Sequence, residues 1–412
     1  MKENRFKTSE FGPIPSDWCV SKFGCVLDTF TTGATPYRGM PENFIGKVRW
    51  ITSGELNYNT INDTIEHISE EAMHKTHLTL HQPGTFLMAI TGLEAEGTRG
   101  RCAFVGKPST TNQSCLAINE QDEVCVEWVY WFYRKYSDYL AFKYSQGTKQ
   151  QSYTARIVEQ LPIYYPELPE QRRIASALSN IDDLIFNLDT LIEKKRNIKQ
   201  GTMQQLLTGK TRLKGFTEPW VEYKMKDIAE INSGGTPSST EPKYYGGNIP
   251  FLSISDMSAS GKFIKHTEKT ITQLGLENSS ARIFPAGTLM YAMYASLGKC
   301  SISLIETSIS QAILGFKLHD KIDRDFLYYH LCFMEDSVKA MGQTGTQTNL
   351  SKGIVEDFNL SLPSLSEQHA IASILTKMDS EITALEQRRE KYAALKQGMM
   401  QQLLTGKIRL VD

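Results

Sequence analysis

One long segment occurs twice in this chain, and this internal repeat restricts the possible folds more than any other feature. With a shift of 197 positions, residues 166–213 match residues 363–410 at 26 of 48 positions. Fainter matches precede each copy, such as Trp18 with Trp220. A period of roughly 200 residues is too long for a solenoid. We therefore expect a duplicated unit in which a globular part is followed by a helical part.

Each copy of the repeat predicts a long helix with one apolar face. Apolar residues recur at steps of four and three, as in a coiled-coil seam. They are Ile174, Leu178, Ile181, Ile185, Leu188 and Ile192 in the first copy, and Ile371, Leu375, Met378, Ile382 and Leu385 in the second. Pro169 is expected in the first turn of the first helix and Ser366 at the N-cap of the second, while Gly209 and Gly406 fit left-handed C-terminal caps. Each helix should span roughly 38 residues, or about 57 Å.

The Gly-Lys-Thr sequence at Gly209 raises the alternative of a phosphate-binding loop. That motif needs a glycine five residues earlier, where this chain has Gln204. The second copy also replaces Thr211 with Ile408. Because both differences remove groups that would hold a nucleotide, the helix cap is the better interpretation of this glycine.

Composition predicts a globular chain of two or three domains, since 412 residues are 40% hydrophobic. A net charge of −1 is not typical of a protein that binds nucleic acid by itself. The seven cysteines include no CxxC pair, which favours reduced thiols over a disulfide framework or a zinc site. No signal-peptide core and no run of eighteen apolar residues is present. We therefore expect a cytoplasmic protein.

The globular parts are expected to mix helices and strands, which gives an α+β fold. Strands are predicted from Phe86 and from Thr288, each after a glycine turn. Aromatic-rich helices are predicted from Glu127 and from Asp325, and their ring stripes fit a core better than a base-stacking surface. The expected division is 1–165 and 214–361 for two globular domains, with 166–213 and 362–412 for the repeat helices.

Catalytic signatures are absent from the sequence. It contains no HExxH, GxSxG or GxGxxG motif, and no Asn-Pro-Pro-aromatic segment of the kind that holds adenine in amino-methyltransferases. His74, His77 and His81 lack partners for a metal site. We expect a chain without catalysis, cofactor or metal, in which two globular parts on a rigid helical spacer recognise something with two ends.

These features resemble the specificity subunit of type I restriction-modification systems. The resemblance covers the whole chain and rests on motifs that occur twice: EQRRIASAL (170–178) and EQHAIASIL (367–375), KQGTMQQLLTGKTRL (199–213) and KQGMMQQLLTGKIRL (396–410), the tryptophans Trp18 and Trp220, and the G-x-T-P turns at Gly33 and Gly234. It implies two target recognition domains that each read half of a bipartite DNA site. It also implies an antiparallel coiled coil that sets the gap between the halves.

The resemblance further implies partner proteins that carry the chemistry. Two adenine N6-methyltransferase subunits would bind the chain, and restriction and translocation subunits would join them. These partners would neutralise much of the DNA phosphate charge, which accounts for the weak charge of this chain. If the helices pair in an antiparallel way, the two domains lie at opposite ends of the coil and read inverted half-sites.

Base recognition needs hydrogen-bonding side chains on loops. The predicted DNA contacts in the first domain are Thr35, Tyr37, Arg38, Thr98, Arg99, Arg101, Lys149, Gln150 and Gln151. Those in the second domain are Ser238, Ser239, Lys243, Tyr244, Tyr294, Lys299, Gln347, Thr348 and Asn349. For any one of these residues, a solvated loop side chain remains the simpler interpretation.

Two glycines inside the helices and one rival function stay open at this point. Gly201 and Gly398 lie where glycine costs about 1 kcal/mol relative to alanine, so we expect a close approach to the backbone by a crossing helix or by a partner. The rival function is a coiled-coil scaffold that joins other proteins without touching DNA. A nucleotide-using enzyme is disfavoured by Gln204 and by the missing motifs.

Overall fold

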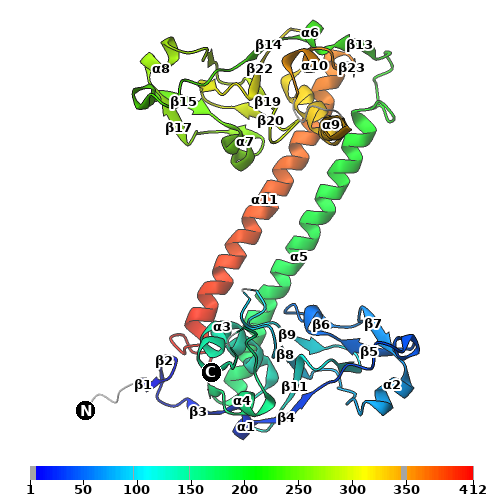
Figure 1. The fold of residues 1–412 in the computed structure, drawn as a ribbon, viewed down its shortest axis with the longest axis vertical. Coiled ribbons are helices and arrows are strands. Elements are labelled where there is room, and N and C mark those ends of the chain that lie inside the picture. The colour runs from blue at the N-terminus through cyan, green and yellow to red at the C-terminus, as the bar shows by residue number, and fades with distance from the viewer. Residues whose placement is uncertain (1–5, 96, 148, 345–349, 412) are drawn as a thin grey trace. The chain divides into compact units, whose positions relative to one another are not determined.

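The chain folds into two compact units, each of which has its own core (Figure 1). The computed structural model describes all residues except 1–5, 96, 148, 345–349 and 412, and the side chains of 341–344. Unit 1 consists of residues 1–188 and 388–412, and unit 2 of residues 189–387. Both units combine helices and sheets, which confirms the α+β class.

The globular part of unit 1 contains a five-stranded and a three-stranded sheet, with strand orders β4-β11-β8-β9-β6 and β10-β5-β7. In the larger sheet β4, β11, β8 and β9 are antiparallel neighbours. Its elements are β1 (Phe6–Ser9), β2 (Gly12–Pro15), β3 (Cys19–Lys22), α1 (Phe23–Val26), β4 (Leu27–Thr32), η1 (Pro41–Phe44), β5 (Val48–Ile51), η2 (Ser53–Glu55), β6 (Thr60–Ile61), β7 (Glu66–Ile68), α2 (Glu70–Lys75), β8 (Phe86–Ala89), β9 (Cys102–Val105), β10 (Ser109–Thr111), β11 (Cys115–Glu120), α3 (Val126–Tyr144), α4 (Ala155–Glu159) and β12 (Pro162–Tyr165).

The globular part of unit 2 repeats this plan, with a five-stranded sheet β14-β22-β19-β20-β16 and a four-stranded sheet β17-β15-β21-β18. Strands β14, β22, β19 and β20 are again antiparallel neighbours. Its elements are β13 (Val221–Lys224), α6 (Met225–Ile228), β14 (Ala229–Ser233), η3 (Pro242–Tyr244), β15 (Tyr245–Leu252), α7 (Ile254–Ser260), β16 (Phe263–Ile264), β17 (Lys269–Ile271), α8 (Gln273–Glu277), β18 (Ile283–Phe284), β19 (Leu289–Ala292), β20 (Cys300–Ser303), β21 (Thr307–Ile309), β22 (Ile313–Leu318), α9 (Arg324–Thr344), α10 (Lys352–Glu356) and β23 (Asn359–Leu362).

The strands predicted from Phe86 and from Thr288 are β8 and β19, and the aromatic helices are α3 and α9. The aromatic stripes lie in the cores, as expected. In α3 the rings of Trp128, Trp131 and Phe132 have at most 1% of their surface exposed, and in α9 those of Phe326 and Tyr329 are fully covered. Because these faces pack inside the units, they are not available to stack on bases.

The two repeat helices are α5 (Leu168–Leu206) and α11 (Leu365–Leu403), which pack together as a coiled coil (Figure 1). The predicted seam is buried from Ile174 to Ile192 in α5, and Ile371, Leu375 and Ile382 are buried in α11. In unit 1 Asp182 of α5 pairs with Lys396 of α11 at 2.6 Å. In unit 2 Lys195 of α5 pairs with Glu381 of α11 at 2.8 Å. Numbers rise along α5 as they fall along α11, so the pairing is antiparallel.

Glycine caps close both helices as predicted. Gly209 and Gly406 have φ values of +67° and +65°, the left-handed conformation that glycine adopts without strain. A Cβ atom on Gly406 would lie 2.3 Å from the Pro15 side chain and 2.9 Å from the Trp18 ring. The cap therefore also lets the end of α11 approach the first residues of the globular part of unit 1.

The prediction that Ser366 caps α11 is wrong. The helix already begins at Leu365, so Ser366 lies inside its first turn. Ser364 precedes the helix, and its carbonyl accepts a hydrogen bond from the Gln368 amide at 3.0 Å. Two neighbouring serines made the start of this helix ambiguous by one turn position. Pro169, by contrast, is the second residue of α5, in the first turn as expected.

The expected close approach at Gly201 and Gly398 is not made by the described part of this chain. A Cβ atom on either glycine would meet no atom within 4 Å, and both residues are exposed. The helix-crossing explanation is therefore wrong for the described residues. Contact with a partner remains as the other explanation that we considered.

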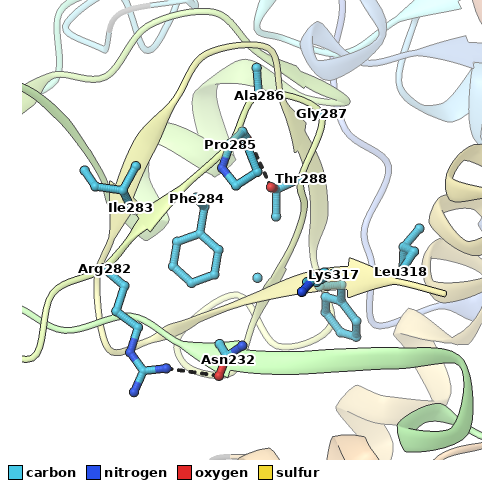
Figure 2. A pocket seen from close by; sticks show the side chains of 12 residues that line it. Asn232, Arg282, Ile283, Phe284, Pro285, Ala286, Gly287, Thr288, Lys317 and Leu318 are labelled. Carbon is cyan, nitrogen blue, oxygen red and sulfur yellow. Dashed lines mark hydrogen bonds between the residues drawn. The ribbon is translucent and has the colours of Figure 1, made fainter.

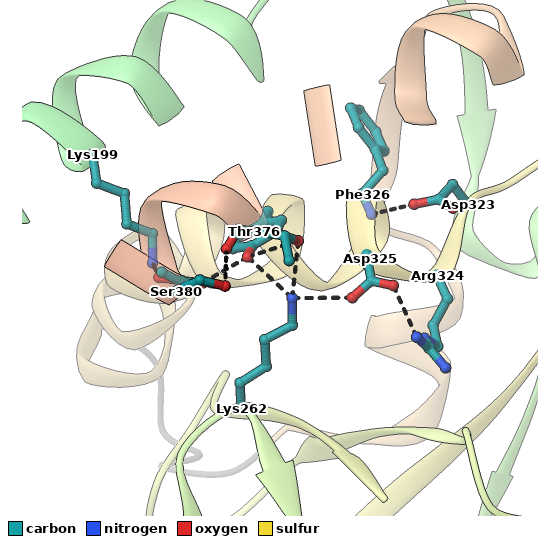
Figure 3. A network of polar contacts seen from close by, with 10 residues as sticks. Lys199, Lys262, Asp323, Arg324, Asp325, Phe326, Thr376 and Ser380 are labelled. Carbon is teal, nitrogen blue, oxygen red and sulfur yellow. Dashed lines mark hydrogen bonds and ion pairs between the residues drawn. The ribbon is translucent and has the colours of Figure 1, made fainter. Parts of the chain in front are cut away.

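A buried polar network joins the globular part of unit 2 to its helices (Figure 3). The Lys262 ammonium donates to the Tyr329 hydroxyl at 3.0 Å and pairs with Asp325 at 3.0 Å. Tyr329 in turn donates to Asp379 of α11 at 2.6 Å, and Asp379 pairs with Lys199 of α5. In unit 1 Arg134 of α3 reaches Asp182 at 2.7 Å. The globular part of each unit is thus anchored to both of its helix segments by charge.

Candidate nucleic-acid interface

The predicted contact loops of unit 1 emerge at one edge of the five-stranded sheet. Strand β4 ends where β11 begins, since Thr32 lies opposite Leu116. Strand β8 ends at the same edge, since Ala89 lies opposite Cys115, and β9 starts there. The chain returns to this edge a third time, where the Tyr153 amide donates to the Ile90 carbonyl at 2.8 Å. We call residues 33–40, 91–101, 112–114 and 146–152 the loop edge of unit 1.

The same topology produces a loop edge in unit 2, consisting of residues 234–244, 293–299, 310–312 and Leu350. Ser233 at the end of β14 lies opposite Leu314, and Ala292 at the end of β19 lies opposite Ile313. The Leu350 amide donates to the Met293 carbonyl at 3.1 Å. Segments far apart in the sequence therefore meet in each unit, which is the arrangement that recognition of one ligand by several loops requires.

Three predicted contacts lie on the first loop of unit 1. The Thr35 hydroxyl donates to the Gln113 side-chain carbonyl at 2.5 Å, and the Tyr37 ring is 71% exposed. Arg38 forms two hydrogen bonds with Glu66, at 2.8 and 2.9 Å, and its guanidinium lies 4.7 Å from the centre of the Phe44 ring. These hydrogen bonds lower the pKa of the Glu66 carboxyl. Arg38 is thus held in place at the surface by a carboxylate and an aromatic ring.

The second loop of unit 1 turns its polar groups onto its own backbone. Thr98 donates to the Gly92 and Ala95 carbonyls, Arg99 donates to the Leu93 carbonyl at 2.6 Å, and Arg101 donates to the Gly97 carbonyl at 2.8 Å. These bonds give the loop a defined shape. They also leave fewer donors for a ligand than the sequence suggests.

The third loop of unit 1 packs beside the second. The Gln151 amide donates to the Glu94 carboxylate at 2.8 Å, and the Leu93 amide donates to the Gln151 carbonyl at 3.0 Å. Lys149 and Gln150 are exposed, and among the described residues no group forms a hydrogen bond with either side chain. These two side chains are the freest of the predicted contacts in this unit.

In unit 2 the predicted contacts are mostly exposed. Ser238 bonds to Thr240 at 2.8 Å, and Ser239 and Tyr244 are solvent-exposed or half-exposed on the same loop. Lys243 pairs with Glu241 at 3.3 Å, and Lys299 donates to the Ser258 carbonyl at 3.3 Å. The Tyr294 ring is 37% exposed. Gln347, Thr348 and Asn349 lie outside the described residues.

Sequence reasoning missed Gln113 and Gln311, which lie on the loop edges at equivalent places. Both are exposed and both accept a hydrogen bond from a threonine of the G-x-T-P turn, Thr35 and Thr236 respectively. Single exposed glutamines carry no pattern that marks them. The repeat itself could have found them, because each stands two residues before the equivalent strands β11 and β22.

The largest described pocket lies away from these loops. It has a volume of about 480 Å³ and faces the carboxyl half of β22, where the Phe284 ring fills the space above Gly315 (Figure 2). None of the predicted contacts lines it. Over the part of the chain that the structure describes, we find no cluster of three or more metal-binding side chains and no helix long and apolar enough to cross a membrane.

Comparison with known proteins places the chain in a family. The family described as type I restriction modification DNA specificity domain matches residues 15–200 and again residues 217–396. The chain belongs to the type I restriction modification DNA specificity family. The two matches correspond to the two repeated globular-plus-helical units, so the internal duplication is a duplication of this family's domain.

Relatives in this family extend over the same length. The type I restriction enzyme MjaVIII specificity subunit of Methanocaldococcus jannaschii is 23% identical over 99% of this chain and 97% of that protein. The MjaIX specificity subunit of the same organism is 27% identical over 70% of this chain and 69% of that protein.

Solved structures of type I systems share the fold. A crystal structure of the restriction-modification system S subunit from M. genitalium superposes with a TM-score of 0.62 at 16% identity, covering 98% of this chain and 97% of that one. A chain from a structure of type I complex assembly and conformational transition gives a TM-score of 0.57 at 17% identity, covering 96% of this chain and 99% of that one.

Proposed function

We propose that this chain is the DNA-recognition subunit of a type I restriction-modification complex. Each globular domain reads one half of a bipartite DNA target, and the paired helices set the gap between the halves. The observation that carries the proposal is the convergence of polar loops at one sheet edge in each unit. The relatives named specificity subunits support the same assignment.

The chemistry of the loop edges suits base recognition better than bulk charge attraction. Arginine, lysine, glutamine, serine and threonine form the paired hydrogen bonds that distinguish base edges in the major groove. Residues of these types gather at the loop edges, although the whole chain has a net charge of only −1. Phosphate neutralisation is then left largely to partner subunits.

The repeat helices support a second part of the proposal, the binding of two methyltransferase subunits. Identity between the copies is uneven: residues 199–213 match 396–410 at 13 of 15 positions, whereas 183–198 match 380–395 at only 4 of 16. The matches include residues that are exposed in both copies and bond to no described side chain: Gln200 and Gln397, Gly201 and Gly398, Gln204 and Gln401, Lys210 and Lys407.

Exposed positions diverge freely unless something contacts them, as the middle of the helices shows. Two retained surfaces with the same residues suit two copies of one partner. We assign them to methyltransferase subunits, which would supply methyl transfer, while restriction and translocation subunits would supply cleavage. The chain itself then contributes recognition without catalysis, in the cytoplasm where the DNA is accessible.

Exchange of one domain tests the proposal. Residues 217–361 are replaced by the equivalent part of a relative, and the chain is assembled with its methyltransferase partner. The complex is incubated with a random duplex library, and the retained DNA is sequenced. We expect one half-site to change while the other half-site and the gap stay the same.

The rival scaffold function makes the opposite forecast. A coiled-coil adaptor would retain no defined sequence with either the parent or the exchanged chain. Loss of both half-sites in an exchanged chain that still assembles would show that the two domains do not read independently. Thermal unfolding of the exchanged chain serves as the folding control.

A further inference from the structure

Each unit carries the same threonine–glutamine pair at its loop edge. In unit 1 the Thr35 hydroxyl donates to the Gln113 side-chain carbonyl, and in unit 2 the Thr236 hydroxyl donates to that of Gln311. All four residues are exposed. The pairs join segments that are 78 and 75 residues apart in the sequence, so no local turn explains them.

The backbone fixes the position of each pair. A Cβ atom on Gly33 would lie 1.7 Å from the Thr111 carbonyl oxygen, and one on Gly234 would lie 1.9 Å from that of Ile309. Only glycine permits this contact between the end of one strand and the end of another. The threonine follows two residues after the glycine, and the glutamine follows two residues after the carbonyl that the glycine touches. Both members of the pair therefore start from a rigid contact.

The hydrogen bond determines what each glutamine can offer to a ligand. A glutamine side chain has one carbonyl acceptor and one amide group with two donor hydrogens. The threonine hydroxyl occupies the carbonyl, and no described residue bonds to the amide of Gln113 or Gln311. Recognition of adenine by glutamine needs the acceptor and the donor together. The held glutamines are better suited to a group that only accepts hydrogen bonds.

The surroundings of the two pairs differ, whereas the pairs do not. Beside Thr35 stand Tyr37 and an arginine held by Glu66, whereas beside Thr236 stand two serines. A pair kept in both domains, among neighbours that differ, suits a feature that every DNA sequence contains. The non-bridging phosphate oxygens are such a feature, and they accept hydrogen bonds without donating any.

We propose that Gln113 and Gln311 each donate their side-chain amide to a DNA backbone phosphate in their own half-site, with Thr35 and Thr236 as positioning residues. This inference rests on the proposed DNA recognition and adds to it a sequence-independent clamp that is common to the two domains. The clamp would fix the height at which each loop edge lies on the duplex, so that the differing neighbours read the bases.

The test uses the full chain assembled with its methyltransferase partner. Gln113→Ala and Gln113→Glu are compared with the parent on the selected target duplex and on an unrelated duplex. We expect affinity for both duplexes to fall by the same factor, about tenfold for alanine and more for glutamate because the carboxylate repels phosphate. The sequence retained from a random library should not change. Gln82→Glu, an exposed glutamine on the opposite side of β8, is the matched control.

Removing the phosphate acceptor should reproduce the effect. A series of target duplexes carries one neutral methylphosphonate at each successive position, and one position in the first half-site should weaken the parent complex by a similar factor. Gln113→Ala should lose nothing more at that position. Thr35→Val should weaken binding in the same way as Gln113→Ala, and Thr35→Ser should restore it, because serine keeps the hydroxyl.

Three outcomes would overturn the inference. A changed base preference at one position would make Gln113 a base reader, and unchanged affinity would make the pair a purely structural turn. A methylphosphonate effect that persists in full in Gln113→Ala would assign that phosphate to another residue. Failure of the parent complex to select any sequence would instead refute the proposed function, so the two failures can be told apart.

Discussion

Matched ion pairs show at the scale of residues how the repeat builds both units. Glu170 at the start of α5 bonds to Arg409 beyond the end of α11, and Glu367 at the start of α11 bonds to Arg212 beyond the end of α5. Both carboxylates are almost fully buried, at 2% and 1% exposure. A buried charge is tolerated only with a well-placed partner. These pairs therefore fix where each helix starts relative to where the other ends.

Removing the partner of a buried carboxylate should be costly. We expect Arg409→Met to lower the free energy of unfolding of unit 1 by about 3 kcal/mol, because Glu170 then loses the guanidinium that compensates its burial. Urea unfolding followed by tryptophan fluorescence measures the change. Arg388→Met, on an exposed position of α11, is the control and should shift stability by less than about 0.5 kcal/mol. Equal effects of both variants would contradict the importance of burial.

The buried ring of His330 should make the stability of unit 2 depend on pH. Burial lowers the pKa of His330 from 6.5 to about 4, since the protonated form loses its water. The unfolded state then takes up a proton below pH 6.5 while the folded state does not. Stability is unaffected above pH 6.5 and falls by up to about 3 kcal/mol as the pH drops to 4.

Comparison of variants isolates this effect from other titrating groups. The difference in unfolding free energy between pH 7 and pH 4.5 should shrink in His330→Phe, which keeps an aromatic ring against Phe326. It should remain in His266→Phe, where the histidine is exposed. A pH dependence that is the same in all three proteins would rule His330 out as its source.

At the scale of elements, the retained surfaces of α5 and α11 explain two glycines that helix propensity disfavours. The space above Gly201 and Gly398 is open, and one turn earlier stand the exposed aliphatic residues Ile198 and Leu395. An exposed apolar residue beside a gap in the side-chain layer suits the close approach of a partner helix. The stability that glycine forfeits is then exchanged for access to the helix backbone.

Substitution at these glycines should separate stability from assembly. Gly201→Ala should raise the unfolding free energy of unit 2 by up to about 1 kcal/mol, because alanine is the better helix former and meets no neighbour. The double variant Gly201→Leu with Gly398→Leu should fold but lose most of its affinity for the methyltransferase subunit, measured by titration. Asn187→Leu, in the diverged middle of α5, is the control. Undiminished binding by the double variant would remove the glycines from the interface.

Patterns that extend over many residues were readable from the sequence, and single contacts were not. The seam from Ile174 to Ile192 repeats often enough to predict α5, and left-handed glycines mark both helix ends. The Ser366 cap failed because two serines compete within one turn. Gln113 escaped notice because its role depends on Thr35, which is distant in the sequence. Convergence of loops follows from strand order, which local sequence does not encode.

At the scale of the whole molecule, the proposed function makes the paired helices a ruler. Four residues added to α5 alone would mismatch the seam with α11. Four residues added after Ile192 and four after Glu386 should lengthen the rod by about 6 Å and roughly keep the apolar faces in register. At about 3.4 Å per base pair, the preferred gap should grow by one or two base pairs.

The methylated sites of cells that carry the lengthened subunit measure this outcome. The half-site sequences should be unchanged, since the loop edges are untouched. The variant with four residues in α5 alone controls for general disruption. An active variant with both insertions that still methylates only the original spacing would show that the coil does not set the gap.

The last turns of α11 belong to the core of the domain that is made first. Leu403 and Leu404 pack in the same cluster as Trp18, and the Tyr164 hydroxyl donates to the Leu404 carbonyl at 2.7 Å. On the ribosome, the first domain must therefore wait for roughly 200 further residues, about 10–40 s at ordinary elongation rates. During this time its open core is a substrate for chaperones. A premature stop codon near residue 388 would consequently damage the domain at the opposite end of the gene.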